Sequence, residues 1–471
     1  MLTIEEIFKE GRNIDEIIKD LRKKSVIVPS WSELVKDYDP KQHKIVTDTN
    51  GRKDKTVDGR LEKASRIYIG LEKLLCNRIN EFTFGIPPKR VYSNLGDNQT
   101  RKDIAKAIEA IYKNAHVDAE NKKRGLAYYA SCEFFTIWYT IKKENTLYGF
   151  KSAYKLKCFT YSPMDGVLLW PLFDERNDLI AMSFEYQKVV EGKTTKYFEC
   201  YTADNMYRYK CDEGEKWEEM TSPDEVSIGK IPGAYLNRDL PVYDGLSVLR
   251  EEIEYTLSRN SDIIAYNAAP VLKVVGELQG EEVKGESRRR YRVENGGDVD
   301  YVSWDQSIES MKYQVENLVD LFFMQGQMPN ISFEKMTGLG SIGYDARQTL
   351  FMDAHLKIGD EAGPWLEFLN RECNVIKAFL KQMNTAWKDE VDNVSVEHII
   401  TPYNQNDTKT DIDNMSKANG GKPLISHRES VERAGLTENV EETMKLLKEE
   451  ASEDAQQKLD ELNAATTIRA I

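Results

Sequence analysis

The stretch GLSVLREEIEYTLSRNSDIIAYNA, Gly245 to Ala268, decides the fold. Apolar residues recur along it at helical spacing, which predicts one long helix of about seven turns with a single apolar stripe. The residues of this stripe are Leu246, Leu249, Ile253, Leu257 and Ile264. Because a helix cannot bury its own stripe, another helix or another copy of the chain must cover it.

A second long helix is predicted from Ser307 to Gln325, with one apolar face made by Ile308, Met311, Val315, Leu318 and Phe322. Between the two helices lies a short insertion with two strand-like runs, VLKVVG from Val271 and DVDYVSW from Asp298. We therefore expect a helical hairpin that carries a small, strand-rich head.

The chain before this hairpin mixes helical and strand patterns. Residues 1–60 predict an amphipathic helix followed by an extended arm or loop. Two further helices are expected from Ala64 to Phe82, where Gly85 and Pro87 break the pattern, and from Asp103 to His116; an aromatic, buried segment follows from Gly125 to Lys142. Short apolar runs then predict an antiparallel meander, closed by a loop at 231–244: Val167 to Leu172, Leu179 to Tyr186, Lys196 to Tyr201 and Met206 to Tyr209.

The chain after the hairpin begins with a turn-rich segment, Met328 to Gly343, and continues as a long helix to about Trp387. Gly363 and Pro364 should bend or interrupt this helix, because proline lacks the backbone donor and clashes with the preceding turn. A lone strand, Val394 to Ile400, comes next, and the end of the chain is helical from Ser426, where Glu429 completes a capping-box pattern. The fold class is therefore α+β.

Composition limits the function. The 471 residues are 40% hydrophobic and 31% charged, which suits two or three compact domains. Apolar stretches are too short to span a membrane, and the charged N-terminus does not fit a secretory signal. Six scattered cysteines without a CxxC pair indicate reduced thiols. The net charge of −14 argues against a surface that grips DNA, although a negative wall would let a duplex slide past.

Motifs for chemistry are missing. GLGSIG, Gly338 to Gly343, matches the dinucleotide fingerprint formally, with Asp360 downstream, but a helix and a proline turn precede it where a strand is required. A flexible loop is the competing interpretation. The five histidines lack metal-ligand spacing, and the acids at 251, 252 and 254 are expected on a solvated helix face. We expect no catalytic, cofactor-binding or metal-binding residues.

The densest basic cluster consists of Arg288, Arg289, Arg290 and Arg292. Two interpretations stay open for it: a solvated hairpin tip, or a contact with nucleic acid or with the acidic residues of a partner.

Four stretches resemble the portal proteins of tailed bacteriophages, of siphophage type, and the likeness covers about residues 60–450. They are CNRINEFTFGIPP (Cys76 to Pro88), YSPMDGVLLWPLFDERNDLIAMSFEYQK (Tyr161 to Lys188), IPGAYLNRDLPVYDGLSVLREEIEYTLSRNSDIIAYNAAPVL (Ile231 to Leu272) and GSIGYDARQTLF (Gly340 to Phe351). Residues 1–60, an N-terminal arm, lie outside it, and their role stays open between an arm, a partner site and a disordered tail.

This resemblance implies a portal fold with a mixed wing domain (61–244, the long helix 346–388 and the strand 389–406), stem helices (245–270 and 306–327), a small α/β clip (271–305), a tunnel loop (328–345) and a helical C-terminal crown (407–471). The loop residues facing DNA would be Met336, Thr337, Gly338, Leu339, Gly340, Ser341, Ile342 and Gly343. The arginines at 288–292 would contact a partner at the clip.

The function implied is a ring, a dodecamer in this family, at one capsid vertex of the virion, assembled in the host cytoplasm. It would be a channel for double-stranded DNA in packaging and ejection, without cofactors and without a membrane. Implied partners are the terminase, head-completion or adaptor proteins, and the major capsid and scaffolding proteins. Two other classes remain: a nucleotide-binding enzyme that uses Gly338 to Gly343, and a cytoplasmic scaffold without a channel.

Overall fold

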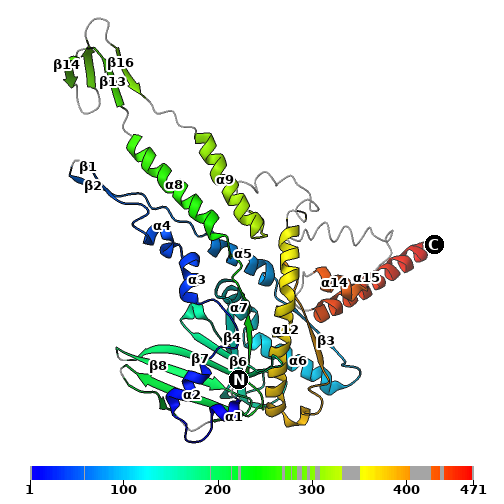
Figure 1. Cartoon of the computed structure of the whole chain (residues 1–471). Helices are drawn as coiled ribbons and strands as arrows, with labels where there is room; N and C mark the ends of the chain where they lie inside the picture. Colours follow the sequence, from blue (N-terminus) through cyan, green and yellow to red (C-terminus); the bar gives the residue numbers. More distant parts are fainter. Residues whose placement is uncertain are drawn as a thin grey trace. The chain divides into compact units, whose positions relative to one another are not determined.

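The computed structural model divides the chain into two compact units, one made of residues 1–342 and 346–403 and the other of 343–345 and 404–471. The structure describes residues 3–57, 59–190, 192–213, 215–220, 224–267, 271–276, 278–283, 289–293, 298–302, 308–330, 349, 351–403, 426–434 and 440–468. Helices and strands both contribute to the first unit, in keeping with the α+β class (Figure 1).

The predicted meander is confirmed as one antiparallel sheet in which the four longest strands pair in chain order. Both of its faces are buried along the middle of the second strand, from Ala181 to Glu185. The strands are β6 (Leu168–Phe173), β7 (Leu179–Val190), β8 (Lys193–Tyr201) and β9 (Asn205–Asp212), with the short β10 (Glu218–Glu219) and β11 (Asp224–Glu225) beside β9.

A second antiparallel sheet has the order β12 (Gly233–Asn237), β4 (Glu133–Asn145) and β5 (Ser152–Tyr161). The predicted loop at 231–244 is thus wrong in its first half, because β12 is a strand too short to show a clear alternation. Gly233 is required there, since a Cβ would lie 2.4 Å from the carbonyl oxygen of Thr136 on β4. The predicted buried segment 125–142 is the end of helix α7 (Val117–Ser131) joined to β4.

The first residues form short helices and not one helix. Gly11, with a φ of +85°, and the N-cap Asn13 separate α1 (Ile4–Ile7) from α2 (Ile14–Leu21). Their apolar residues are buried against the meander sheet, in a cluster with Leu172, Ala181, Phe198, Cys200 and Tyr209. The chain continues through α3 (Trp31–Tyr38), η1 (Pro40–Gln42), α4 (Lys44–Thr47) and the hairpin β1 (Lys55–Val57) and β2 (Arg60–Glu62).

Helices α5 (Leu71–Phe84), α6 (Gln99–Asn114) and α7 form the middle of the first unit. The prediction that α5 begins at Ala64 is wrong: residues 63–70 have no helical or strand assignment. Gly125 of α7 packs directly on α5, where a Cβ would lie 2.0 Å from Oδ1 of Asn80. The predicted strand near residue 394 is β17 (Ser395–Ile399), which pairs with β3 (Lys89–Ser93).

Helix α12 (Met352–Met383) runs without interruption through Gly363 and Pro364, so of the predicted bend or interruption the interruption is wrong. The next residue, Trp365, explains this, because its fully buried ring contacts Phe84, Tyr128, Phe134 and Phe368. Burial of one such aromatic side chain contributes about 2–3 kcal/mol, comparable with the roughly 3 kcal/mol that an internal proline costs. The 3-10 helix η3 (Thr385–Trp387) follows.

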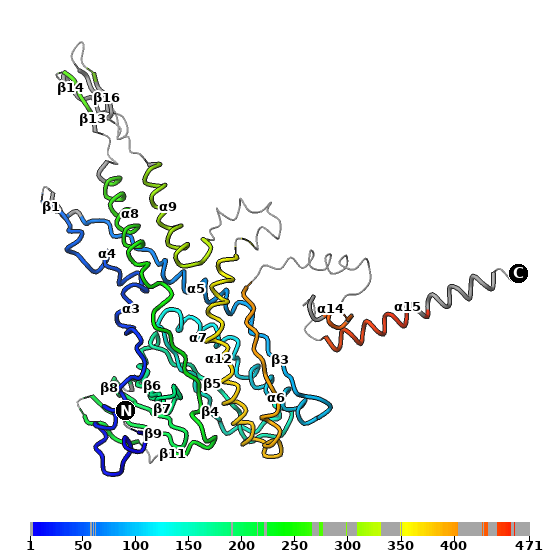
Figure 2. The backbone as a smooth tube through the Cα atoms, turned by 45° about the vertical axis from the view of Figure 1, so that its right-hand side comes forward, coloured from blue at the N-terminus to red at the C-terminus, as the bar shows by residue number. Residues whose placement is uncertain are grey.

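The predicted hairpin is present. Its helices are α8 (Ser247–Asn267) and α9 (Ile308–Gln325), which lie side by side in Figures 1 and 2. The insertion consists of β13 (Val271–Val275) paired with β16 (Asp298–Val302), and β14 (Leu278–Val283) paired with β15 (Arg289–Val293). In the second unit, α14 (His427–Ala434) and α15 (Val440–Ile468) confirm a helical end, and Glu429 N–H donates to Ser426 Oγ at 3.2 Å.

A completely buried ion pair joins α7 to α12 inside the first unit. Arg124 of α7 donates from Nη2 and Nη1 to Glu372 of α12 at 2.7 and 3.1 Å, and Trp138 of β4 donates to the same carboxylate at 2.9 Å. Burial lowers the pKa of Arg124, but Glu372 more than offsets this and raises it overall. The pair therefore fixes α12 against α7 and β4.

Glu372→Gln should lower the free energy of unfolding by about 3–5 kcal/mol, because it leaves the buried guanidinium without a counter-charge. Urea titration followed by tryptophan fluorescence measures this loss. The control is Glu367→Gln on the same helix, whose pair with Arg371 is about half exposed, so its effect should stay below about 1 kcal/mol. Equal stability of Glu372→Gln and the parent protein would contradict the role given to this pair.

Candidate functional site

The inner side of α8 carries a polar stripe beside the apolar residues that it buries, among them Ile253. Arg250, Glu254, Ser258 and Asp262 follow one another at intervals of four residues and so lie on one face of the helix. Arg250, Glu254 and Ser258 are completely buried. Among the predicted solvated acids, Glu252 is exposed as expected, but for Glu254 the prediction is wrong.

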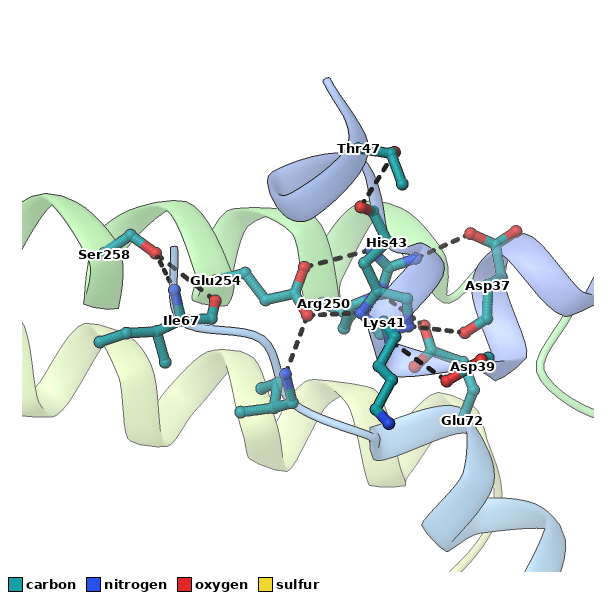
Figure 3. A network of polar contacts seen from close by, with 11 residues as sticks. Asp37, Asp39, Lys41, His43, Thr47, Ile67, Glu72, Arg250, Glu254 and Ser258 are labelled. Atoms are coloured by element: carbon teal, nitrogen blue, oxygen red, sulfur yellow. Dashed lines mark hydrogen bonds and ion pairs between the residues drawn. The ribbon is translucent and has the colours of Figure 1, made fainter. Parts of the chain in front are cut away.

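An extended segment, residues 64–70, lies along this stripe and is called the strap here. Every second backbone N–H of the strap donates to the stripe: Ser65 to Asp262 at 2.8 Å, Ile67 to Ser258 at 2.8 Å and Ile69 to Glu254 at 2.9 Å. Figure 3 shows the bond between Ile67 and Ser258. The two spacings match, since two extended residues rise about 6.6 Å and four helical residues about 6 Å. The strap thus satisfies its amides with side chains of α8.

At the base of the stripe, charges are buried in compensating pairs. Arg250 Nε donates to Glu72 of α5 at 2.9 Å, and Nη2 donates to Asp37 of α3 at 2.7 Å. His43 Nδ1 lies 2.6 Å from Glu254 Oε1, and Nε2 lies 2.9 Å from the Asp37 carbonyl oxygen. Because a carbonyl oxygen only accepts, Nε2 carries a proton, and a further proton lies between His43 and Glu254.

This network joins α8 to three other elements, α3, α5 and the residue before α4, so it fixes where the hairpin leaves the rest of the unit (Figure 3). Burial raises the pKa of Glu72 although Arg250 opposes the shift, and Oε2 of Glu72 is buried with no hydrogen-bond partner. Burial opposes ionisation of Asp262 too, but the bonds from Ser65 and the charge of Arg52 lower its pKa.

The outer sides of the hairpin expose large apolar side chains. On α8, Val248 is 70% exposed and Tyr255 is 44% exposed. On α9, Tyr313 is 68% exposed and Met324 is 65% exposed. The predicted stripe of α8 is buried at Leu246 and Ile253, whereas Ile264 at its far end is 55% exposed. Two different helices therefore each present an uncovered apolar face.

The site residues predicted from the sequence do not belong to the strap or its network. The loop residues Met336 to Gly343 and Arg288 lie outside the described residues. Arg289, Arg290 and Arg292 belong to β15, where the backbone register places Arg290 opposite Glu282 and Arg289 opposite Val283 of β14. The strap and its network escaped the sequence analysis, because backbone amides leave no side-chain signal; the only trace was the four-residue spacing of polar residues on α8.

Several features of the described residues bear on metals, thiols and membranes. Within the described ranges, no group of three or more His, Cys, Asp or Glu side chains is arranged to hold a metal ion. All six cysteines are free thiols. Asp360 lies within helix α12 and not at the end of a strand, where the acid of a dinucleotide site would lie. None of the described helices has both the length and the apolar character needed to cross a bilayer.

Arg250→Met should destabilise the base of the hairpin by about 3–5 kcal/mol, because it leaves buried Glu72 without a counter-charge. Thermal unfolding measures the loss, and limited proteolysis should cut the strap faster. Arg259→Met is the matched control, since Arg259 is exposed on the same helix. Strap cleavage at the parental rate in Arg250→Met would refute this role.

Comparisons with known proteins give a family and distant structural likenesses. No curated protein matches the chain. It is similar to the neck of an empty GTA particle computed with C6 symmetry, at 11% identity and a TM-score of 0.40 over 88% of this chain and 95% of that one. It is also similar to the neck of a native GTA particle computed with C12 symmetry, at 10% identity and a TM-score of 0.37 over 89% and 98%.

The family model for phage portal proteins of the SPP1 Gp6-like type matches residues 24–457, which include the strap, both hairpin helices and their insertion. This chain therefore belongs to the SPP1 Gp6-like family of phage portal proteins.

Proposed function

We propose that this portal protein assembles into a closed ring, a dodecamer, whose channel passes double-stranded DNA during packaging and ejection at one vertex of the virion. The role is structural and not catalytic. The ring would be assembled in the host cytoplasm before DNA enters the capsid.

The uncovered outer faces of α8 and α9 carry this proposal. Val248 and Tyr255 are seven residues apart and share one side of α8, while Tyr313 and Met324 are eleven apart and share one side of α9. Two different patches on one subunit fit a head-to-tail contact, in which α8 of one copy covers α9 of the next. Such contacts close into a ring when the rotation between subunits is a full turn divided by a whole number and there is no shift along the axis.

Rigidity of the hairpin supports the same conclusion. The inner face of α8 is occupied by the strap and by the network around Arg250, so it is not available to a neighbouring subunit. The outer face of α8 is therefore the one left for a neighbouring subunit, and the buried network at the base sets its direction. The net charge of −14 per subunit would give a ring that repels DNA phosphates and so lets the duplex slide.

We assign the parts of the chain by the family resemblance: an N-terminal arm (1–60), wing (61–244 with 346–388 and 389–406), stem helices (245–270 and 306–327), clip (271–305), tunnel loop (328–345) and crown (407–471). The clip, with Arg288 to Arg292, would dock the terminase and later the head-completion or adaptor proteins. The wing and crown would meet capsid and scaffolding proteins.

Tyr313→Glu should convert the ring to monomers, because it places a charge in the centre of the contact between subunits. Mass photometry and negative-stain imaging of the purified protein measure this. Gln314→Glu adds the same charge at an adjacent exposed position of α9 and should leave the ring intact. A parent protein that forms only open or low-order oligomers would contradict the ring and favour a scaffold without a channel.

Shortening the loop from Met336 to Gly343 should leave ring assembly unchanged and block DNA packaging, because three glycines between long helices suit a mobile element that follows the DNA. The measurement is the yield of DNA-filled particles when the shortened protein complements a phage that lacks its portal gene. Packaging at normal yield would refute the role of this loop.

A further inference from the structure

The β4–β5 hairpin differs in charge from the rest of this acidic chain. Residues 138–160 contain five lysines and a single acid, Glu144, whereas the whole chain has a net charge of −14. The lysines are Lys142, Lys143, Lys151, Lys155 and Lys157. Among the described residues, none of these five takes part in an ion pair: their charge is left uncompensated.

Two of these lysines share a face with aromatic side chains. Tyr139 lies opposite Lys157 in the β4–β5 register, and Ile137 lies opposite Phe159. Residues directly opposite each other, and every second residue along a strand, point to the same side of a sheet. Lys155, Lys157, Phe159 and Tyr161 of β5 therefore lie on one face with Tyr139 of β4, and Phe159 is 51% exposed.

Ring contacts extend this face to the meander sheet. The rings of Phe159 and Tyr161 lie 4.9 Å apart, and Tyr161 stacks on Phe184 at 4.4 Å and on Tyr186 at 6.3 Å. Tyr186 of β7 in turn stacks on Tyr197 of β8 at 5.3 Å, and Lys188 Nζ lies over both rings at 5.2 and 5.6 Å. Together these residues form one continuous surface, which we call the lysine–tyrosine surface: Tyr139, Lys155, Lys157, Phe159, Tyr161, Tyr186, Lys188 and Tyr197.

The acid within this surface is already occupied. Glu199 accepts hydrogen bonds from the hydroxyls of Tyr186 at 2.8 Å and Tyr201 at 3.0 Å. Lys188, like Lys155 and Lys157, has no ion pair among the described residues. Burial raises the pKa of Tyr161 to about 12, so its hydroxyl stays protonated and can donate. The surface therefore offers ammonium and hydroxyl donors to an anionic ligand.

We propose that the lysine–tyrosine surface binds the phosphate backbone of duplex DNA, at a place separate from the channel. A duplex fits better than single strands, because the tyrosine rings stack on one another and under Lys188, which leaves bases few free ring faces. It also fits better than a protein, since lysine is depleted at protein interfaces but is a common point-charge partner of phosphate. The inference rests on the proposed function in one respect: it takes double-stranded DNA to be the polyanion that the protein meets.

A covalently closed circular duplex separates this surface from the channel, because a closed circle has no end to thread through a closed ring. We expect the full-length protein to bind a fluorescent DNA minicircle in anisotropy titrations between 50 and 200 mM NaCl, with an affinity that falls as salt rises. Binding of linear duplex without binding of the circle would confine DNA to the channel and overturn the proposal. Failure of the ring to form would count against the proposed function and not against this surface.

A triple variant should weaken minicircle binding at least about tenfold at the lowest salt; it combines Lys155→Gln, Lys157→Gln and Lys188→Gln. It should also reduce the slope of log affinity against log salt by about 3, as expected for three lost phosphate contacts. The control combines Lys9→Gln, Lys106→Gln and Lys113→Gln, three exposed lysines elsewhere, and should bind like the parent. Equal loss in both triple variants would overturn the proposal. The proposal would also be overturned if polyglutamate of equal charge displaced the minicircle as effectively as unlabelled DNA does. That result would indicate that the surface binds an acidic protein.

Discussion

The contact between the strap and α8 is the constraint on which the rest of the hairpin depends. An extended segment has to satisfy its backbone amides, and here the side chains of Glu254, Ser258 and Asp262 do so. This arrangement uses one whole face of α8 inside the subunit. Val248 and Tyr255 on the outer side of α8 remain exposed, which is what an assembling subunit requires and a monomer would avoid.

Buried charge plays the same positional role twice in this chain. Arg250 with Glu72 holds the base of the hairpin, and Arg124 with Glu372 holds α12 against α7 and β4. A buried ion pair adds little net stability compared with well-packed apolar groups, but losing one partner is costly. A wrong placement of these helices would leave a buried charge without its partner. Such pairs therefore penalise wrong placements more than they stabilise the right one.

Most of the helices and strands could be predicted from periodic apolar patterns. The strap and its network could not be predicted, because they depend on contacts made by the backbone. The long helix from Gly245, the meander and the helical end all follow from spacing, and the structure confirms them. Strand β12 was too short to read, and Ile67 resembled a helix position although it belongs to the strap. Glu254 looked like any surface acid, because nothing in its own segment indicates that His43 and the strap cover it.

The strap has a consequence for how this chain can change over time. At 67 and 69 it contributes backbone amides to α8, so almost any residue except proline satisfies these contacts, whereas at 65 the serine side chain also bonds Asp262. Its length is another matter, because an inserted or deleted residue would shift the amides out of phase with the four-residue spacing of the helix. Substitutions should therefore accumulate freely at 67 and 69 while insertions and deletions are excluded from the segment, and related chains would share the length of the strap more than the residues at these two positions.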